Sequence, residues 1–421
     1  MTTTQPLDQP SAPQGSSPPR PRTPPAAPTV PGPSLGRLVG VDLARAVAVF
    51  GMYVVHIGPP LSTTDGVASW IRYLADGHSS VLFATLAGFS LTLIAGRPEP
   101  KTGRAGRQAR ARIAIRAVVL LALGTAMAME YGGVVILGFY GVYFLLALPL
   151  VRLRTKTLAI TAAALALVAP QLAYVLNSQL SGPMQSISAH DPLLRLSDVG
   201  VLDLLLTGFY PAMTWMPFVV AGLALGRLDL SATVVQWRLA IFGAGITVAA
   251  YGTSLLLAGS DALRSTAEDG SSSSGSSGSW SGSSGSVPLD SGSFDDKWSA
   301  SGLLVAGPHS GTTFDIIGSV GVAILMIVAA TVAMERLPRL RRLATPVIAV
   351  GTMSLTAYVG HFVIQGWLPW FGASYDEESW VLLILFVLGA IAFAGIWSRF
   401  VGRGPLEFLL NAATKPARLI R

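Results

Sequence analysis

The feature that most constrains this chain is a series of long apolar stretches separated by short polar loops. A helix needs about 20 apolar residues to cross the hydrocarbon core of a bilayer, and stretches near that length recur ten times here. Because lipid offers the backbone no hydrogen-bond partners, such stretches must be helical. The pattern predicts an all-α fold, a polytopic membrane helix bundle with about ten transmembrane helices. The stretches are 37–58, 77–96, 111–129, 133–151, 157–177, 203–226, 237–258, 312–334, 344–368 and 379–401.

The composition agrees with a chain that lies mostly in lipid. Hydrophobic residues make up 51% of it and charged residues only 12%, whereas soluble proteins carry about 25% charged residues. The net charge of +7 is spread over short loops. This argues against a nucleic-acid partner and for the anionic cytoplasmic leaflet. The sequence has no cysteine, which excludes a disulfide framework, a thiolate nucleophile and a cysteine metal site.

The charges of the loops predict the orientation of the helices. Lys and Arg in short loops mark the cytoplasmic side of a membrane protein. Here they concentrate in the loops that follow even-numbered stretches, and both termini are basic as well. We therefore expect a multi-pass protein of the cell membrane with both termini cytoplasmic and the lipid bilayer as its main partner. The basic loop residues are Arg97, Lys101, Arg104, Arg107, Arg110, Arg112, Arg152, Arg154, Lys156, Arg227, Arg238, Arg336, Arg339, Arg341 and Arg342.

Two regions have compositions that cannot form a packed core. Residues 1–36 are rich in proline and poor in large apolar side chains, so we expect a disordered cytoplasmic tail. Residues 270–286 are Ser and Gly except for Trp280, within an outer-loop insert that covers 259–308. The remaining assignments are a transmembrane domain at 37–401 and a cytoplasmic C-terminal segment at 402–421.

Three ionisable residues lie in the first apolar stretch, where such groups usually face a partner or a water-filled cavity. Asp42, Arg45 and His56 fall on one side of a helix that turns by about 100° per residue. A rise of ~1.5 Å per residue separates Asp42 from His56 by about 21 Å, so His56 lies near the outer side. The alternative is structural: an ion pair between Asp42 and Arg45, with His56 as an interfacial residue.

Two more histidines are predicted at the depth of His56. His78 opens the second stretch, and His361 lies in the outer half of the ninth. A neutral imidazole can accept a proton from a sugar hydroxyl near pH 7, which favours a general base. A three-histidine metal site is the competing interpretation, but no H-x-x-x-H spacing is present, so we expect no metal. His190 and His309 lie in outer loops, where we expect them to be solvated.

Five further residues are weaker candidates for the site and could line a substrate cavity. For each aromatic residue among them, the alternative is packing in the core or anchoring at the membrane interface. Asp315 and Glu407 are further carboxylates that merit one mutation each. No phosphate-binding loop or soluble-hydrolase nucleophile motif is present in the sequence. The candidate cavity residues are Tyr140, Tyr210, Trp215, Tyr358 and Gln365.

Four short motifs carry a family resemblance. They are 41–52 with His56 at its end, 80–88, 351–358 and 404–410. Their order resembles that of the YeiB-like membrane proteins, within the transmembrane acyltransferases that include acyltransferase-3 proteins and heparan-alpha-glucosaminide N-acetyltransferase. The resemblance covers both ends of the membrane body.

The resemblance implies a fold and a reaction. A cytosolic acyl-CoA, acetyl-CoA in the first instance, donates its acyl group to an extracytoplasmic glycan or small-molecule acceptor. Arg45 and His56 match the arginine and the catalytic histidine of acyltransferase-3 proteins. In heparan-type members the catalytic histidine lies in the following outer loop, to which His78 is nearest. We expect Asp42 and Arg45 to organise the inner vestibule. Arg112 and Arg116 are the residues that we expect to attract the CoA phosphates.

Other functions remain open at this point. A polar line across a bundle also suits a transporter or permease of a small polar solute. A non-catalytic envelope protein could keep the fold without the chemistry. The oligomeric state is not fixed by the sequence, and a homodimer is compatible with it. Binding of acyl-CoA distinguishes the enzyme from both alternatives.

Overall fold

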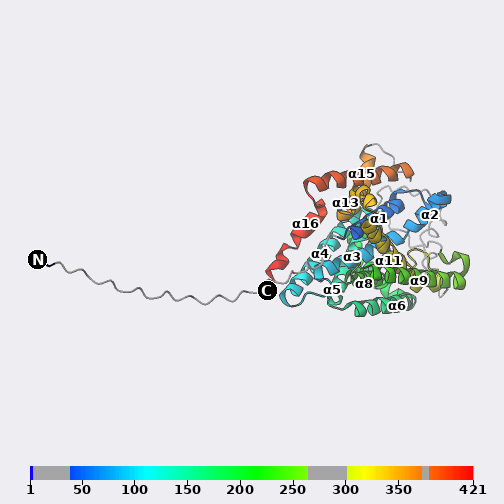
Figure 1. Ribbon diagram of the computed structural model, residues 1–421. Coiled ribbons are helices and arrows are strands. Elements are labelled where there is room, and N and C mark those ends of the chain that lie inside the picture. Colours follow the sequence, from blue (N-terminus) through cyan, green and yellow to red (C-terminus); the bar gives the residue numbers. More distant parts are fainter. Residues whose placement is uncertain (3–37, 264–300, 372–378, 421) are drawn as a thin grey trace. The chain divides into compact units, whose positions relative to one another are not determined.

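The computed structural model describes residues 1–2, 38–263, 301–371 and 379–420, and every regular element in these ranges is helical. This confirms the all-α prediction (Figure 1). The Pro-rich tail and the Ser/Gly-rich part of the outer-loop insert lie outside the described residues. The residues from Leu38 onward form one compact unit.

Each of the ten apolar stretches contains a helix. The ninth is two helices, α13 and α14, bent by 85° at Met353. The helices are α1 (Val39–Ile57), α3 (His78–Ala95), α4 (Gly103–Tyr131), α5 (Leu137–Leu150), α6 (Thr155–Ala189), α8 (Ala212–Gly226), α9 (Thr233–Ala258), α11 (Thr313–Arg336), α13 (Thr345–Thr352), α14 (Ser354–Trp367) and α15 (Trp380–Phe400).

The number of helices that can cross a bilayer is smaller than the number of apolar stretches. Within the described residues, seven helices are long and apolar enough to span, or eight if α13 and α14 count as one span. α5 and α8 have 14 and 15 residues, which at 1.5 Å per residue reach only about 21–23 Å of the ~30 Å core. The structure therefore supports a multi-pass membrane protein, while the count of ten and the orientation stay predictions.

Shorter helices lie between and after these elements. α2 (Gly66–Ala75) precedes α3, and the C-terminal segment consists of α16 (Pro405–Ala413) and the 3-10 turn η7 (Lys415–Leu419). The remaining ones are α7 (Pro192–Ser197), α12 (Pro338–Leu343), η1 (Leu61–Thr63), η2 (Gly132–Val134), the π-helical turn η3 (Asp203–Thr207), η4 (Gly259–Leu263), η5 (Gly302–Leu304) and η6 (Leu368–Phe371).

Close backbone packing holds the centre of the bundle together. α3 packs against α8, α1 and α11, and α8 packs in turn against α6. A Cβ on Gly222 of α8 would overlap the carbonyl oxygen of Thr85, and one on Gly88 of α3 would overlap the carbonyl of Val219. Only glycine permits this approach, and each added carbon here would force the two backbones apart. Nearly every residue of α8 is buried, which explains how so short a helix persists in a membrane body.

Candidate active site: a histidine pair and a cationic pocket

The polar stripe of α1 begins with an ion pair. Nη1 of Arg45 lies 2.8 Å from Oδ1 of Asp42, as the spacing of three residues predicts. Nη2 of Arg45 donates a second hydrogen bond of 2.8 Å to Oγ of Ser90 in α3. Asp42 is only 6% exposed, so this charge is compensated inside the bundle. The pair therefore ties α1 to α3.

His56 and His361 meet at the other end of α1. Nδ1 of His56 and Nε2 of His361 are 2.9 Å apart, and the two rings stack with centroids 5.2 Å apart. His361 is 1% exposed, whereas His56 keeps partial exposure. Because Nδ1 of His56 is engaged by His361, its Nε2 is the nitrogen left for a substrate. The structure thus brings together two of the three predicted histidines.

Predicted residues of α14 surround this pair. Nε2 of Gln365 donates a hydrogen bond of 3.3 Å to the carbonyl of His56. The hydroxyl of Tyr358 accepts a hydrogen bond of 3.2 Å from the backbone N–H of Ile136, at the start of α5, and its ring packs edge-on against His361. Gln365 and Tyr358 therefore hold the histidines in place by contacts with the backbone.

His78 belongs to a separate polar network. Its Nδ1 lies 3.0 Å from the carbonyl of Asp76 and its Nε2 3.0 Å from the hydroxyl of Tyr251 in α9. Tyr251 contacts Ser319, which donates to Asp315 at the start of α11. These contacts link α3, α9 and α11. The described residues contain no group of three or more His, Cys, Asp or Glu that could hold a metal ion.

The solvated state expected for His309 is wrong. Its side chain is 8% exposed and its Nε2 lies 3.9 Å from Oδ1 of Asp76. Pro308 packs near Gly77, where the chain has a positive φ, and His309 itself has a φ of 63°. The loop therefore turns back onto the helices and carries the ring inward, whereas His190 is exposed as expected.

Two of the predicted cavity residues contact His309 instead of the histidine pair. The ring of Trp215 stacks on His309 at 6.0 Å between centroids, and the ring of Tyr210 meets it edge-on at 5.6 Å. Tyr140 is also buried, and its hydroxyl has no hydrogen-bond partner among the described residues. We refer to Trp215, Tyr210 and His309 as the aromatic wall. His309, like Arg72 and Asp76, lies within electrostatic range of His56.

Sequence patterns gave no sign of Arg72 and Asp76. Nη1 of Arg72, in α2, lies 4.0 Å from Oδ2 of Asp76, just beyond the end of that helix. Both side chains are largely buried. The only available signal was their spacing of four residues, which is common on exposed helices and therefore not specific.

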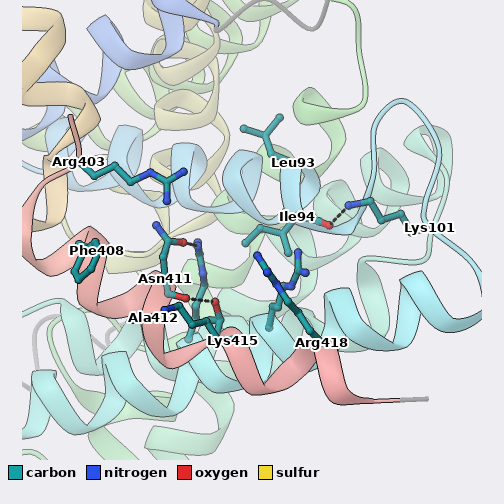
Figure 2. Close-up of a pocket in the computed structure, with 12 residues that line it drawn as sticks. Leu93, Ile94, Lys101, Arg403, Phe408, Asn411, Ala412, Lys415 and Arg418 are labelled. Atoms are coloured by element: carbon teal, nitrogen blue, oxygen red, sulfur yellow. Dashed lines mark hydrogen bonds between the residues drawn. The ribbon is translucent and has the colours of Figure 1, made fainter. Parts of the chain in front are cut away.

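A cationic pocket of about 390 Å³ lies at the end of α3 away from His78. Figure 2 shows Leu93 and Ile94 of α3 on one side and Asn411 of the C-terminal segment on another. Six Lys or Arg residues and no Asp or Glu are among the described residues that line it. The six are Lys101, Arg112, Arg116, Arg403, Lys415 and Arg418.

The pocket is lined both by residues that the sequence predicted as a CoA site and by residues that it did not. Arg112 and Arg116 of α4 lie in it as neighbours on one helix face, and Nη2 of Arg116 donates a 2.5 Å hydrogen bond to Oδ1 of Asn411. Ser90, the partner of Arg45, precedes Ile94 by about one turn of α3. Six cations, with no carboxylate among the described residues that line the pocket, favour a ligand with several phosphates.

Two family models match successive parts of the chain. A family model described as heparan-alpha-glucosaminide N-acetyltransferase, catalytic, matches residues 37–257, from α1 through α9. A second, described as a protein of unknown function (DUF418), matches residues 287–416, which include α14 and α16. No curated protein matches the chain at a significant level. Since the first model covers more than half of the chain, the protein belongs to the heparan-alpha-glucosaminide N-acetyltransferase catalytic family, as its sequence motifs indicate.

Proposed function

We propose that this protein is a membrane acyltransferase that binds acyl-CoA in the cationic pocket and passes the acyl group, acetyl in the first instance, to an acceptor at His56. The observation that carries the proposal is the six-cation pocket at one end of a helix bundle whose other end holds the hydrogen-bonded pair of His56 and His361. The family match supports the reaction class.

The pocket suits the nucleotide end of CoA. A diphosphate and a 3′-phosphate supply several negative charges, and Arg112 and Arg116 can bind phosphate oxygens bidentately. A volume of about 390 Å³ lies within the usual range for small-molecule sites. The pantetheine arm then extends along α3, past the Asp42–Arg45 pair, toward His56. Arg45 and His56 are 11 residues apart in α1, or about 16 Å along its axis.

His56 acts as the general base in this mechanism. Its Nε2 removes a proton from a hydroxyl or amine of the acceptor as that group attacks the thioester carbonyl. The C–S bond breaks, and the CoA thiolate leaves and takes the proton back from His56. For Nε2 to hold a lone pair, Nδ1 must carry the proton and donate it to His361, so His361 sets the tautomer of His56. A positioned base of this kind contributes about 10²- to 10⁴-fold in rate.

The acceptor approaches from the side opposite the pocket. The loop charges predict that this is the extracytoplasmic side of the cell membrane. The aromatic wall of Trp215, Tyr210 and His309 is largely buried near His56, and aromatic faces commonly pack against the apolar faces of sugar rings. We therefore place an extracytoplasmic glycan or a small molecule with a hydroxyl or amine at this wall.

The test uses purified full-length protein in lipid nanodiscs. We expect it to bind radiolabelled acetyl-CoA and to transfer the label to glucosamine or to a total membrane glycan fraction. His56→Ala should bind acetyl-CoA as the parent does and lose at least about 100-fold in transfer. Undiminished transfer by His56→Ala would remove His56 from the mechanism. Folded parent protein that does not bind acetyl-CoA would refute the acyltransferase proposal and favour a transporter or a non-catalytic protein.

A further inference from the structure

The C-terminal segment, α16 and η7, contacts two helices that are remote in sequence. On one side it forms a wall of the cationic pocket, where Asn411 accepts a 2.5 Å hydrogen bond from Arg116. The carbonyl of Arg418 accepts another, of 3.0 Å, from Nε2 of Gln108. On the other side α16 contacts α14, the helix that carries His361. The segment therefore touches both the pocket (Figure 2) and α14, the helix that supports the histidine pair.

Glu407 makes the contact with α14. Its Oε1 accepts hydrogen bonds from the backbone N–H groups of Leu355 (2.8 Å) and Thr356 (3.1 Å). Its Oε2 accepts a 2.5 Å hydrogen bond from Oγ1 of Thr356. The same Oγ1 accepts a hydrogen bond of 3.1 Å from the backbone N–H of Leu406. The first turn of α14 therefore donates hydrogen bonds to α16 and also accepts one from it.

This carboxylate replaces a cap that α14 lacks. The helix starts directly after an 85° bend, and its N-cap residue, Met353, makes no side-chain cap hydrogen bond. The first N–H groups of a helix need acceptors, and a negative charge is favourable at the positive end of the helix dipole. Glu407 meets both needs from a separate helix. Loss of a capping side chain commonly frees the first turn of a helix.

The position of His361 depends on this helix start. His361 lies seven residues after Ser354, about two turns into α14. Its hydrogen bond with His56 tolerates little displacement, because such bonds weaken steeply with distance and angle. The motifs at 351–358 and 404–410, which sequence analysis singled out without assigning a role, contain Thr356 and Glu407.

We propose that Glu407 is a positioning residue that couples the wall of the cationic pocket to the His56–His361 pair through the start of α14. The coupling rests on the proposed acyltransferase function. Removing the carboxylate loosens both ends of the link, so it weakens donor binding and misaligns His361 together. A residue that served stability alone would reduce the folded fraction without changing the constants of the folded protein.

The test compares four variants of the full-length protein in nanodiscs. Glu407→Ala removes all three acceptor contacts, and Glu407→Gln keeps a carbonyl oxygen for the α14 backbone. Thr356→Val removes the hydroxyl that Thr356→Ser retains. The matched control is Glu335→Ala, because Glu335 also accepts a side-chain hydrogen bond, of 2.6 Å from Gln236, at the far end of α11. Each is measured per mole of folded protein for the Kd of acetyl-CoA and the kcat of transfer.

For Glu407→Ala we expect the Kd of acetyl-CoA to rise several-fold and kcat to fall about tenfold. Glu407→Gln and Thr356→Ser should recover much of both, whereas Glu335→Ala should resemble the parent. Unchanged Kd and kcat in folded Glu407→Ala would overturn the proposal.

Hydrogen exchange measured by mass spectrometry separates this proposal from the proposed function. Amides of residues 355–361 should exchange faster in Glu407→Ala than in Glu335→Ala, without any donor present. Unchanged exchange in this segment would overturn the positioning role even if transfer fell. Faster exchange in a protein whose folded parent does not bind acetyl-CoA would refute the acyltransferase function while supporting the link between Glu407 and His361.

Discussion

The histidine pair and the cationic pocket are built in opposite ways. The pair consists of a buried His361 on α14 and a partly exposed His56 on α1, joined by one 2.9 Å hydrogen bond. The pocket collects six cations from α4, the loop before it and the C-terminal segment, around an open volume of about 390 Å³. Proton transfer needs one geometry, whereas binding of a polyanion needs a sufficient number of charges. We therefore expect loss of one histidine to lower kcat sharply. Loss of each pocket cation should lower the affinity for the donor by a further step.

The largest effect is expected in the pocket when two cations are removed together. Each charge-assisted hydrogen bond contributes about 1.5–3 kcal/mol. Arg112→Ala should therefore raise the Kd of acetyl-CoA about tenfold, and Arg112→Ala with Arg116→Ala at least about 100-fold. Isothermal titration calorimetry on nanodiscs measures both.

The control for the arginines removes the same charge elsewhere. Arg341 and Arg342 lie in α12 and are exposed, outside the residues that line the pocket. Arg341→Ala with Arg342→Ala should leave the Kd within about twofold, because exposed charges are screened by salt. An equal loss of affinity in this control would mean that net charge, and not the pocket, attracts the donor.

A smaller effect is expected when the histidine pair loses its supporting member. His361→Ala leaves Nδ1 of His56 without its partner, so the tautomer with a lone pair on Nε2 is no longer favoured. We expect kcat to fall about 10- to 100-fold while the Kd of acetyl-CoA is unchanged. His361→Asn, which keeps an acceptor, should retain more activity than His361→Ala. A rise in Kd without a fall in kcat would place His361 on the donor side and break the division between the two sites.

The smallest effect is expected at the aromatic wall. His309→Gln keeps a hydrogen-bonding group near Asp76 but removes the ring that stacks on Trp215. Loss of one aromatic contact costs about 0.5–1.5 kcal/mol, so the KM for the acceptor should rise about 2- to 10-fold. The Kd of acetyl-CoA should stay the same. If the donor were affected instead, the wall would belong to the pathway of CoA and not to the acceptor.

Sequence periodicity could predict the part of the site that lies on helices. Asp42, Arg45 and His56 share a face because a helix repeats every 3.6 residues, and the first two are bonded as their spacing predicts. His361 was found from its depth in an apolar stretch. Arg112 and Arg116, which line the pocket, were predicted because loops rich in Arg are expected to face the cytosol, where a phosphate-bearing donor would lie.

The residues that sequence reasoning missed are brought in by tertiary contacts. Arg403, Lys415 and Arg418 look like ordinary cytoplasmic charges until α16 packs against α4. His309 follows a turn whose inward direction is set by packing of Pro308 near Gly77. Hydropathy alone cannot distinguish a helix buried in protein, such as α8, from one that faces lipid. Seven or eight helices of the described residues are long and apolar enough to span, so the count of ten stays a prediction.

The glycine contacts between α3 and α8 have a consequence for how an acyl group can travel. Backbones in direct contact cannot slide past one another without a clash, so α3 and α8 behave as one rigid unit. His78 and Ile94 stand at opposite ends of α3, about 24 Å apart along its axis. In the proposed mechanism, this fixed length keeps the distance between the two ends of α3 constant, so we expect the flexible arm of the donor to cross it without a relative movement of the two helices.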